Sequence, residues 1–114
     1  MLPVGDVKIW LAKSPCDMRK AIHGLSVLVI DSLASEPQNG EVFVFYNRGK
    51  DRIKALYWHH NGFCLLQKRL EQGRFKIPEV IEGSKLSLSE HQLKCLFEGL
   101  HFVKSTQSES HYYY

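Results

Sequence analysis

An Asn61-Gly62 dipeptide separates two runs of aromatic, aliphatic and basic residues, Arg52–Trp58 and Phe63–Glu71. Asn-Gly is the strongest short-range signal for a two-residue hairpin turn, because both residues tolerate the positive φ that such turns require. The two runs therefore predict a pair of antiparallel strands. The alternative is a helix over Cys64–Gln72, since its leucines also recur with a period near four. We prefer the hairpin.

Side chains of the hairpin alternate between two faces. The first face is basic, holds Arg52, Lys54 and Arg69, and ends in Trp58. The second face is apolar, so we expect it to meet the core beneath the helices; its members on the first strand are Ile53, Ala55 and Tyr57. A turn at Asn61-Gly62 would place Lys54 opposite Arg69 and Arg52 opposite Glu71. Two opposed cations are mildly destabilising unless an anion lies between them.

The N-terminal part predicts a strand and then a helix. Asp6–Leu11 alternates apolar and polar residues, which is typical of a strand. Ser14 suits a helix cap, Pro15 suits the first helical turn, and Asp17 suits the positive end of the helix. An apolar stripe extends this helix to Leu33, and Gly24 interrupts it where a close backbone contact is expected; the stripe consists of Met18, Ile22, Leu25, Val29 and Leu33.

The rest of the chain predicts a central strand and a second helix. Val42–Tyr46 is continuously apolar, as in strands covered on both faces. Phe75–Ser84 predicts a loop, after which Leu86 and Leu88 predict a brief extended piece. Ser89 and Gln92 fit a capping box ahead of an apolar helical face. The order βαβββα predicts one small α+β domain over residues 1–104, with an antiparallel meander of about four strands packed against two helices, and a flexible polar tail over residues 105–114.

Basic residues concentrate around the hairpin. The stretch from Arg48 to Lys76 holds eight of the fifteen Lys and Arg residues and two acids, whereas the rest of the chain is net acidic. This asymmetry favours a polyanionic partner, because Arg and Lys bind phosphates and aromatic rings stack on exposed bases. The alternative is a solvated sheet face with ordinary protective cations. The predicted nucleic-acid contacts are Arg48, Arg52, Lys54, Trp58, Lys68, Arg69, Arg74 and Phe75, with Arg19 and Lys20 as secondary contacts.

Catalytic and metal chemistry are not expected. A nuclease needs clustered carboxylates, yet capping explains Asp17, a turn explains Asp51, and pairing with Arg52 explains Glu71. The histidines and cysteines lack zinc-ligand spacing. We therefore predict no enzyme, no cofactor and no metal. Three widely spaced cysteines and no apolar run near the ~20 residues of a membrane span predict free thiols in a cytoplasmic protein, with Cys16 buried for structure.

Several motifs carry a family resemblance. They begin with Asp17-Met18-Arg19-Lys20 and Gly24-Leu25, and continue through Phe43-Val44-Phe45, Asn47-Arg48, Asp51-Arg52-Ile53-Lys54, Tyr57-Trp58, Gly62-Phe63, Lys68-Arg69-Leu70-Glu71, Gly73-Arg74-Phe75, Pro78 and Glu98-Gly99-Leu100. With these motifs the chain resembles, from about Asp6 to His101, the small accessory protein of the IS-sixty-six family of bacterial insertion sequences. This protein is encoded by the second reading frame and is often called TnpB. Gly49 departs from the family's usual Arg and removes one cation from the turn.

The resemblance implies a role in DNA transposition beside a separate, larger transposase that cuts and joins DNA. Together with the basic hairpin it predicts a non-catalytic accessory protein that contacts DNA at the element ends. The alternative is a protein–protein adaptor that binds the transposase through the same surface, with Trp58 and Arg69 as anchors. A third possibility is self-association through an exposed strand edge.

Overall fold

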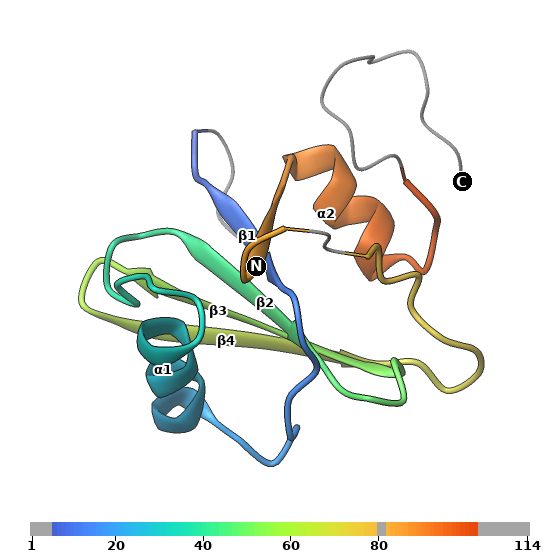
Figure 1. Ribbon diagram of the computed structural model, residues 1–114, viewed down its shortest axis with the longest axis horizontal. Coiled ribbons are helices and arrows are strands. Elements are labelled where there is room, and N and C mark those ends of the chain that lie inside the picture. The colour runs from blue at the N-terminus through green and yellow to red at the C-terminus, as the bar shows by residue number, and fades with distance from the viewer. Residues whose placement is uncertain (1–5, 80–81, 103–114) are drawn as a thin grey trace.

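A five-stranded sheet forms the centre of the protein (Figure 1). The computed structural model describes residues 6–79 and 82–102 of the 114 residues. In sheet order the strands run β4-β3-β2-β1-β5. The predicted α+β class is confirmed. The elements are β1 (Ile9–Ala12), α1 (Ile22–Asp31), β2 (Val42–Tyr46), β3 (Arg52–His59), β4 (Gly62–Arg69), β5 (Lys85–Leu88) and α2 (Glu90–Phe97).

The sheet is mixed, which differs from the predicted antiparallel meander of about four strands. β1 pairs in parallel with β2, whereas β5 pairs antiparallel with β1 on its other side. A parallel pair needs a long crossover, and α1 with its flanking loops supplies it. The brief extended piece predicted at Leu86 and Leu88 is the fifth strand.

The two helices cover opposite faces of the sheet, one below and one above it in Figure 1. On one face, Leu25 and Val29 of α1 pack with Phe43 and Leu56. On the other face, α2 packs through Leu93 and Leu96 over a second set of sheet residues that includes Val42, Val44, Ile53, Ala55 and Tyr57. All five residues of β2 are buried, as the continuous apolar run predicted. The prediction that one hairpin face alone meets the core is wrong, because Leu56 on the basic face is buried beneath α1.

The hairpin is confirmed, and β4 excludes the alternative helix. Its register differs by two residues from the prediction, because His60 and Asn61 form the turn and His59 pairs with Gly62. His60 adopts a positive φ of 58°, a conformation that the sequence had assigned to Asn61-Gly62. A shift of two residues keeps every side chain on its predicted face. It does change the partners, so that Arg52 lies opposite Arg69 and Lys54 lies opposite Gln67.

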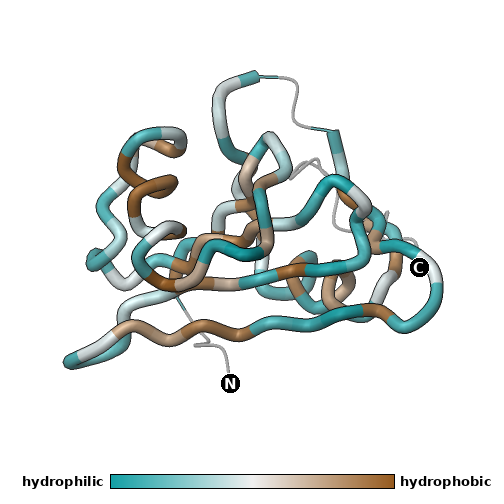
Figure 2. The backbone as a smooth tube through the Cα atoms, turned by 90° about the horizontal axis from the view of Figure 1, so that it is seen from below, coloured by the Kyte–Doolittle hydropathy of each residue, from teal (hydrophilic) through white to brown (hydrophobic). Residues whose placement is uncertain are grey.

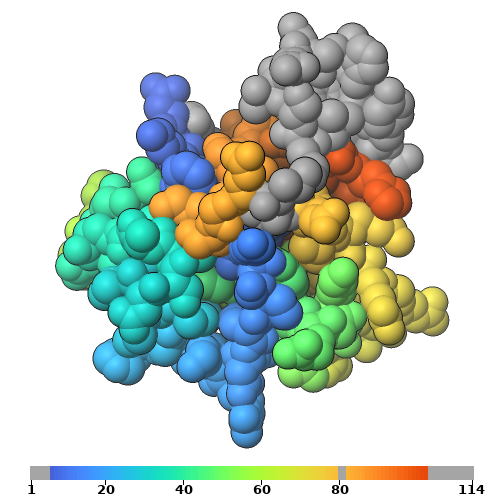
Figure 3. All heavy atoms as spheres, viewed as in Figure 1, coloured from blue at the N-terminus to red at the C-terminus, as the bar shows by residue number. Residues whose placement is uncertain are grey.

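α1 begins at Ile22, several residues after the predicted start at Ser14-Pro15. The Cys16 N–H donates to the carbonyl of Tyr46 at 2.9 Å, which ties this segment to the end of β2. The carbonyls of Met18 and Lys20 accept hydrogen bonds from the Lys54 ammonium. These contacts take up main-chain groups that a helix would need. The segment before α1 is therefore a loop laid across β3, and Figure 3 shows it in blue at the lower edge beside α1.

α2 confirms the predicted capping box. The Ser89 hydroxyl accepts from the Gln92 N–H at 3.0 Å, and the Gln92 side chain accepts from the Ser89 N–H at 2.8 Å. Gly99, with a φ of 77°, follows the helix end. Neither described helix has the length and apolar character to cross a membrane. The tail predicted over residues 105–114 lies outside the described residues.

Candidate functional site

A basic pocket of about 380 Å³ lies over the end of β3 and β4 that is remote from the hairpin turn. Among the residues that the structure describes, no acid lines it. In Figure 2 the hairpin changes along its length from hydrophobic brown to hydrophilic teal. The pocket contains four of the predicted contact residues, and its lining consists of Met18, Arg52, Ile53, Lys54, Gln67, Lys68 and Arg69.

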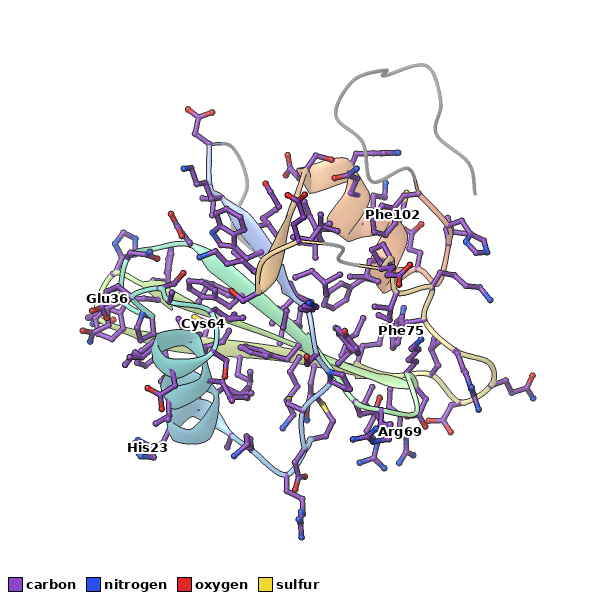
Figure 4. All side chains as sticks on the ribbon, viewed as in Figure 1. His23, Glu36, Cys64, Arg69, Phe75 and Phe102 are labelled. Atoms are coloured by element: carbon purple, nitrogen blue, oxygen red, sulfur yellow. The ribbon has the colours of Figure 1, made fainter. Side chains whose placement is uncertain are left out.

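Arg52 and Arg69 stand directly opposite each other on adjacent strands. Both are exposed, and Arg69 projects on the α1 side of the sheet in Figure 4. Arg69 also contacts Glu71 at 3.4 Å, but this pair is largely solvent-exposed and stabilises the fold little. Two facing guanidinium groups repel each other, and an oxyanion between them would turn that repulsion into attraction. The pair is therefore the feature of the pocket whose chemistry best suits an anion.

Lys54 forms the floor of the pocket and has a structural role. Its Nζ atom donates to the carbonyl oxygens of Met18 and Lys20, each at 2.8 Å. Both acceptors belong to the loop that leads into α1. The ammonium is thus engaged by the protein's own main chain, while its positive charge still contributes to the local field.

Asn47 organises the turn between β2 and β3, where Arg52 begins its strand. Its amide donates to the Asp51 carboxylate at 2.6 Å, and its oxygen accepts from the Arg52 N–H at 3.0 Å. The hydrogen bond from Asn47 lowers the pKa of Asp51, and the charges of Arg52 and Arg69 lower it further. The Asp51 carboxylate is therefore explained by this turn, as the sequence predicted.

The segment after β4 folds back onto this turn. The Phe75 N–H donates to the Lys50 carbonyl at 2.7 Å, and the Leu70 N–H donates to the Asp51 carbonyl at 2.8 Å. These bonds bring exposed Arg74 to the end of the sheet that carries exposed Arg48. Phe75 itself is only 2% exposed and packs on the α2 side, as Figure 4 shows. It is a core residue in this structure and has no surface for the predicted base stacking.

The Lys68 side chain points away from the other cations of the pocket. Although it contributes to the pocket lining, its Nζ atom donates to the Phe97 carbonyl at 2.6 Å, at the end of α2. Alternation along β4 agrees with this direction, because neighbouring Gln67 and Arg69 face the α1 side. Lys68 therefore stabilises the negative end of α2, which the sequence did not predict.

Trp58 lies near the hairpin turn and outside the basic pocket. It lies four positions along β3 from Lys54, which corresponds to about 13 Å. Its half-buried ring packs edge-on against Phe63, with centroids 5.0 Å apart. The structure therefore does not join Trp58 to the arginine pair.

The secondary contacts Arg19 and Lys20 lie in the loop before α1 and not in the first turns of the predicted helix. Arg19 pairs with Asp17 at 2.6 Å, and the hydrogen bonds from Arg19 lower the pKa of Asp17 to about 2. The stem of Lys20 lies close to Gly24, where a Cβ atom would be 3.2 Å from it. The neighbour is therefore a side chain of the preceding turn and not the backbone contact that the sequence led us to expect at Gly24.

Glu71 and Cys16 are the remaining acidic and sulfur groups that the sequence singled out. Glu71 contacts Arg69 and not Arg52 as predicted, because the register differs. No group of three His, Cys, Asp or Glu side chains in residues 6–79 and 82–102 is placed to hold a metal ion. The Cys16 thiol is half-buried, and burial raises its pKa, which fits a structural role.

Two features of this face escaped the sequence prediction. Met18 and Gln67 line the pocket, yet Met18 belonged to a predicted helical stripe and Gln67 is uncharged. The second feature is an exposed apolar surface on α1, made of Ile22, Val27 and Ile30. Their spacing could have revealed it, because α1 carries apolar residues on more than one side.

Comparison with known proteins identifies the family. The model described as IS66 Orf2 like protein matches residues 7–107. The uncharacterized protein y4jC of Sinorhizobium fredii (strain NBRC 101917 / NGR234) is 34% identical over 102 residues, which cover 90% of this chain and 86% of y4jC. The uncharacterized protein y4hO of the same strain is 37% identical over 101 residues, covering 88% and 87%. No solved structure matches significantly. The chain therefore belongs to the family of IS66 Orf2-like proteins, which are accessory proteins of insertion sequences.

Proposed function

We propose that this protein is a non-catalytic accessory factor of transposition that contacts the DNA of the element ends through Arg52 and Arg69. The observation that carries the proposal is the opposed arginine pair at a pocket whose lining has no acid. Arg48 and Arg74, at the same end of the sheet, extend the basic surface.

The arginine pair matches a DNA phosphate in geometry as well as in charge. Each guanidinium offers a planar fork of donors that matches phosphate oxygens. Asn47 and the Lys54 contacts fix the surrounding main chain, so only the arginine side chains need ordering when an anion binds. The partial contact from Glu71 is weak enough to be displaced.

The test is a titration of element-end DNA with the double variant Arg52→Ala/Arg69→Ala at several salt concentrations. Loss of two phosphate contacts should reduce the slope of log K against log salt by about 2. The control Lys8→Ala/Lys94→Ala removes two exposed cations elsewhere and should keep the slope. Equal affinity and slope in the arginine variant and the wild type would refute DNA contact at this site.

The second candidate is an adaptor that binds the transposase of the same element through the same basic surface. The specific observation in favour of a protein partner is the exposed apolar surface of α1, which covers the same face of the sheet as the arginine pair and would extend the contact; Ile30 is 53% exposed and Val27 is 40% exposed. A pull-down with the transposase should be run beside the DNA titration. Loss of transposase capture in Arg52→Ala/Arg69→Ala, with DNA affinity retained, would select the adaptor role.

A further inference from the structure

The volume of the basic pocket is larger than one bound phosphate needs. Its volume of about 380 Å³ is in the range of small-ligand pockets, and it is a surface pocket open to solvent. One water molecule, by comparison, takes about 30 Å³ of liquid. Room therefore remains in the pocket beside a phosphate held by Arg52 and Arg69.

The remaining lining has the chemistry of a base-binding surface. Gln67 is exposed and lies opposite Lys54, and its amide can both donate and accept hydrogen bonds. Met18 is half-buried and carries a polarizable thioether that packs well against flat rings. A lining for phosphate alone would need neither group.

Met18 is also held in place before any ligand binds. Its carbonyl accepts from the Lys54 ammonium at 2.8 Å, so the wall formed by the loop is tied to the floor formed by β3. Asp17 and Arg19, on either side of Met18, also contact each other at 2.6 Å, but this pair is solvent-exposed and adds little to the fixing of the wall. A wall fixed in this way reduces the ordering cost of binding.

An intact duplex does not offer a base to such a pocket. Its bases are stacked inside, and extruding one costs a few kcal/mol. A single-stranded end exposes both phosphate and base without that cost. The part of the lining that is not cationic would therefore favour a single strand over a duplex.

We infer that the basic pocket receives one unpaired deoxynucleotide, with its phosphate at Arg52 and Arg69 and its base against Met18 and Gln67. This inference rests on the proposed DNA contact and names the form of DNA that is bound. The protein would then bind single-stranded ends or overhangs of the element and not the duplex surface.

The test compares three DNA molecules with the same duplex: blunt, with a short thymidine overhang, and with an abasic overhang of equal length. The last two carry equal charge and differ only in their bases. The thymidine overhang should bind about fivefold more tightly than the abasic one, a factor that corresponds to ~1 kcal/mol. Gln67→Ala and Met18→Leu should each reduce this ratio and keep the salt slope, whereas the control Gln72→Ala, at an exposed site after β4, should preserve it.

The outcomes distinguish failure of the nucleotide pocket from failure of the proposed DNA contact. Equal binding of the thymidine and abasic overhangs, with affinity that still depends on Arg52 and Arg69, would overturn the nucleotide pocket and leave DNA contact standing. Absence of binding to all three molecules would overturn both. Urea unfolding midpoints equal to that of the wild type confirm that each variant is folded, and Met18→Leu is chosen because it conserves side-chain volume.

Discussion

The ammonium nitrogen of Lys54 lies 2.8 Å from the main-chain oxygen of Met18. This bond joins the middle of the sheet to a loop 36 residues earlier in the chain. A lysine that charge alone presents as a DNA contact therefore also determines where α1 begins. The same residue gives the basic pocket both its floor and the position of its wall.

Lys54→Met should destabilise the protein by about 2 kcal/mol, because two carbonyls lose charge-assisted hydrogen bonds at a half-buried site. The measurement is the free energy of unfolding in urea. The control Lys76→Met, at an exposed position, should change it by less than about 0.5 kcal/mol. Similar stabilities of the two variants would show that the Lys54 bonds do not hold the loop.

Asp17 should titrate with a pKa of about 2 in the native protein, since the hydrogen bonds from Arg19 favour its ionised form. Its ordinary value is 3.8, so the folded pKa is the lower one. The pair thus stabilises the fold above about pH 4, and that contribution is lost as the pH falls toward 2. Carboxyl NMR titration measures this pKa directly. In Arg19→Ala the pKa should return toward 3.8; an unchanged value would assign the shift to another cause.

Lys68→Met should affect stability and leave DNA binding largely intact. Its ammonium donates to the Phe97 carbonyl, where a cation stabilises the helix end by about 0.3–1 kcal/mol. Urea unfolding should therefore show a small loss, while the salt slope of DNA binding stays at the wild-type value. If Lys68→Met instead lowered the slope by about 1, Lys68 would be a phosphate contact as the sequence alone predicted.

Elements specified by local patterns were predictable from the sequence. The continuous run Val42–Tyr46 gave a strand buried on both faces, and Ser89 with Gln92 gave the start of α2. Both signals act within a few residues, so no distant contact competes with them. The basic residues were also found, because composition alone reveals a local excess of charge.

Features determined by distant contacts were not predictable. Ser14 and Pro15 have the chemistry of a helix start, but Lys54 binds the following carbonyls and the helix begins later. Composition likewise shows that Lys68 is charged but not where its side chain points, which depends on the position of α2. The apolar character of Phe75 fitted a surface stacking role as well as a core role until its neighbours were known.

Two substitutions in the hairpin turn test the register of the strands, because they should change the stability of the protein in opposite directions. Among the described non-glycine residues, His60 has a positive φ and Asn61 does not. His60→Gly should therefore stabilise the protein by about 0.5 kcal/mol, since glycine adopts this conformation without strain. Asn61→Gly gains no such relief and should destabilise it by about 0.5–1 kcal/mol through greater freedom of the unfolded chain. Unfolding in urea measures both, and the opposite signs would favour a turn at Asn61-Gly62.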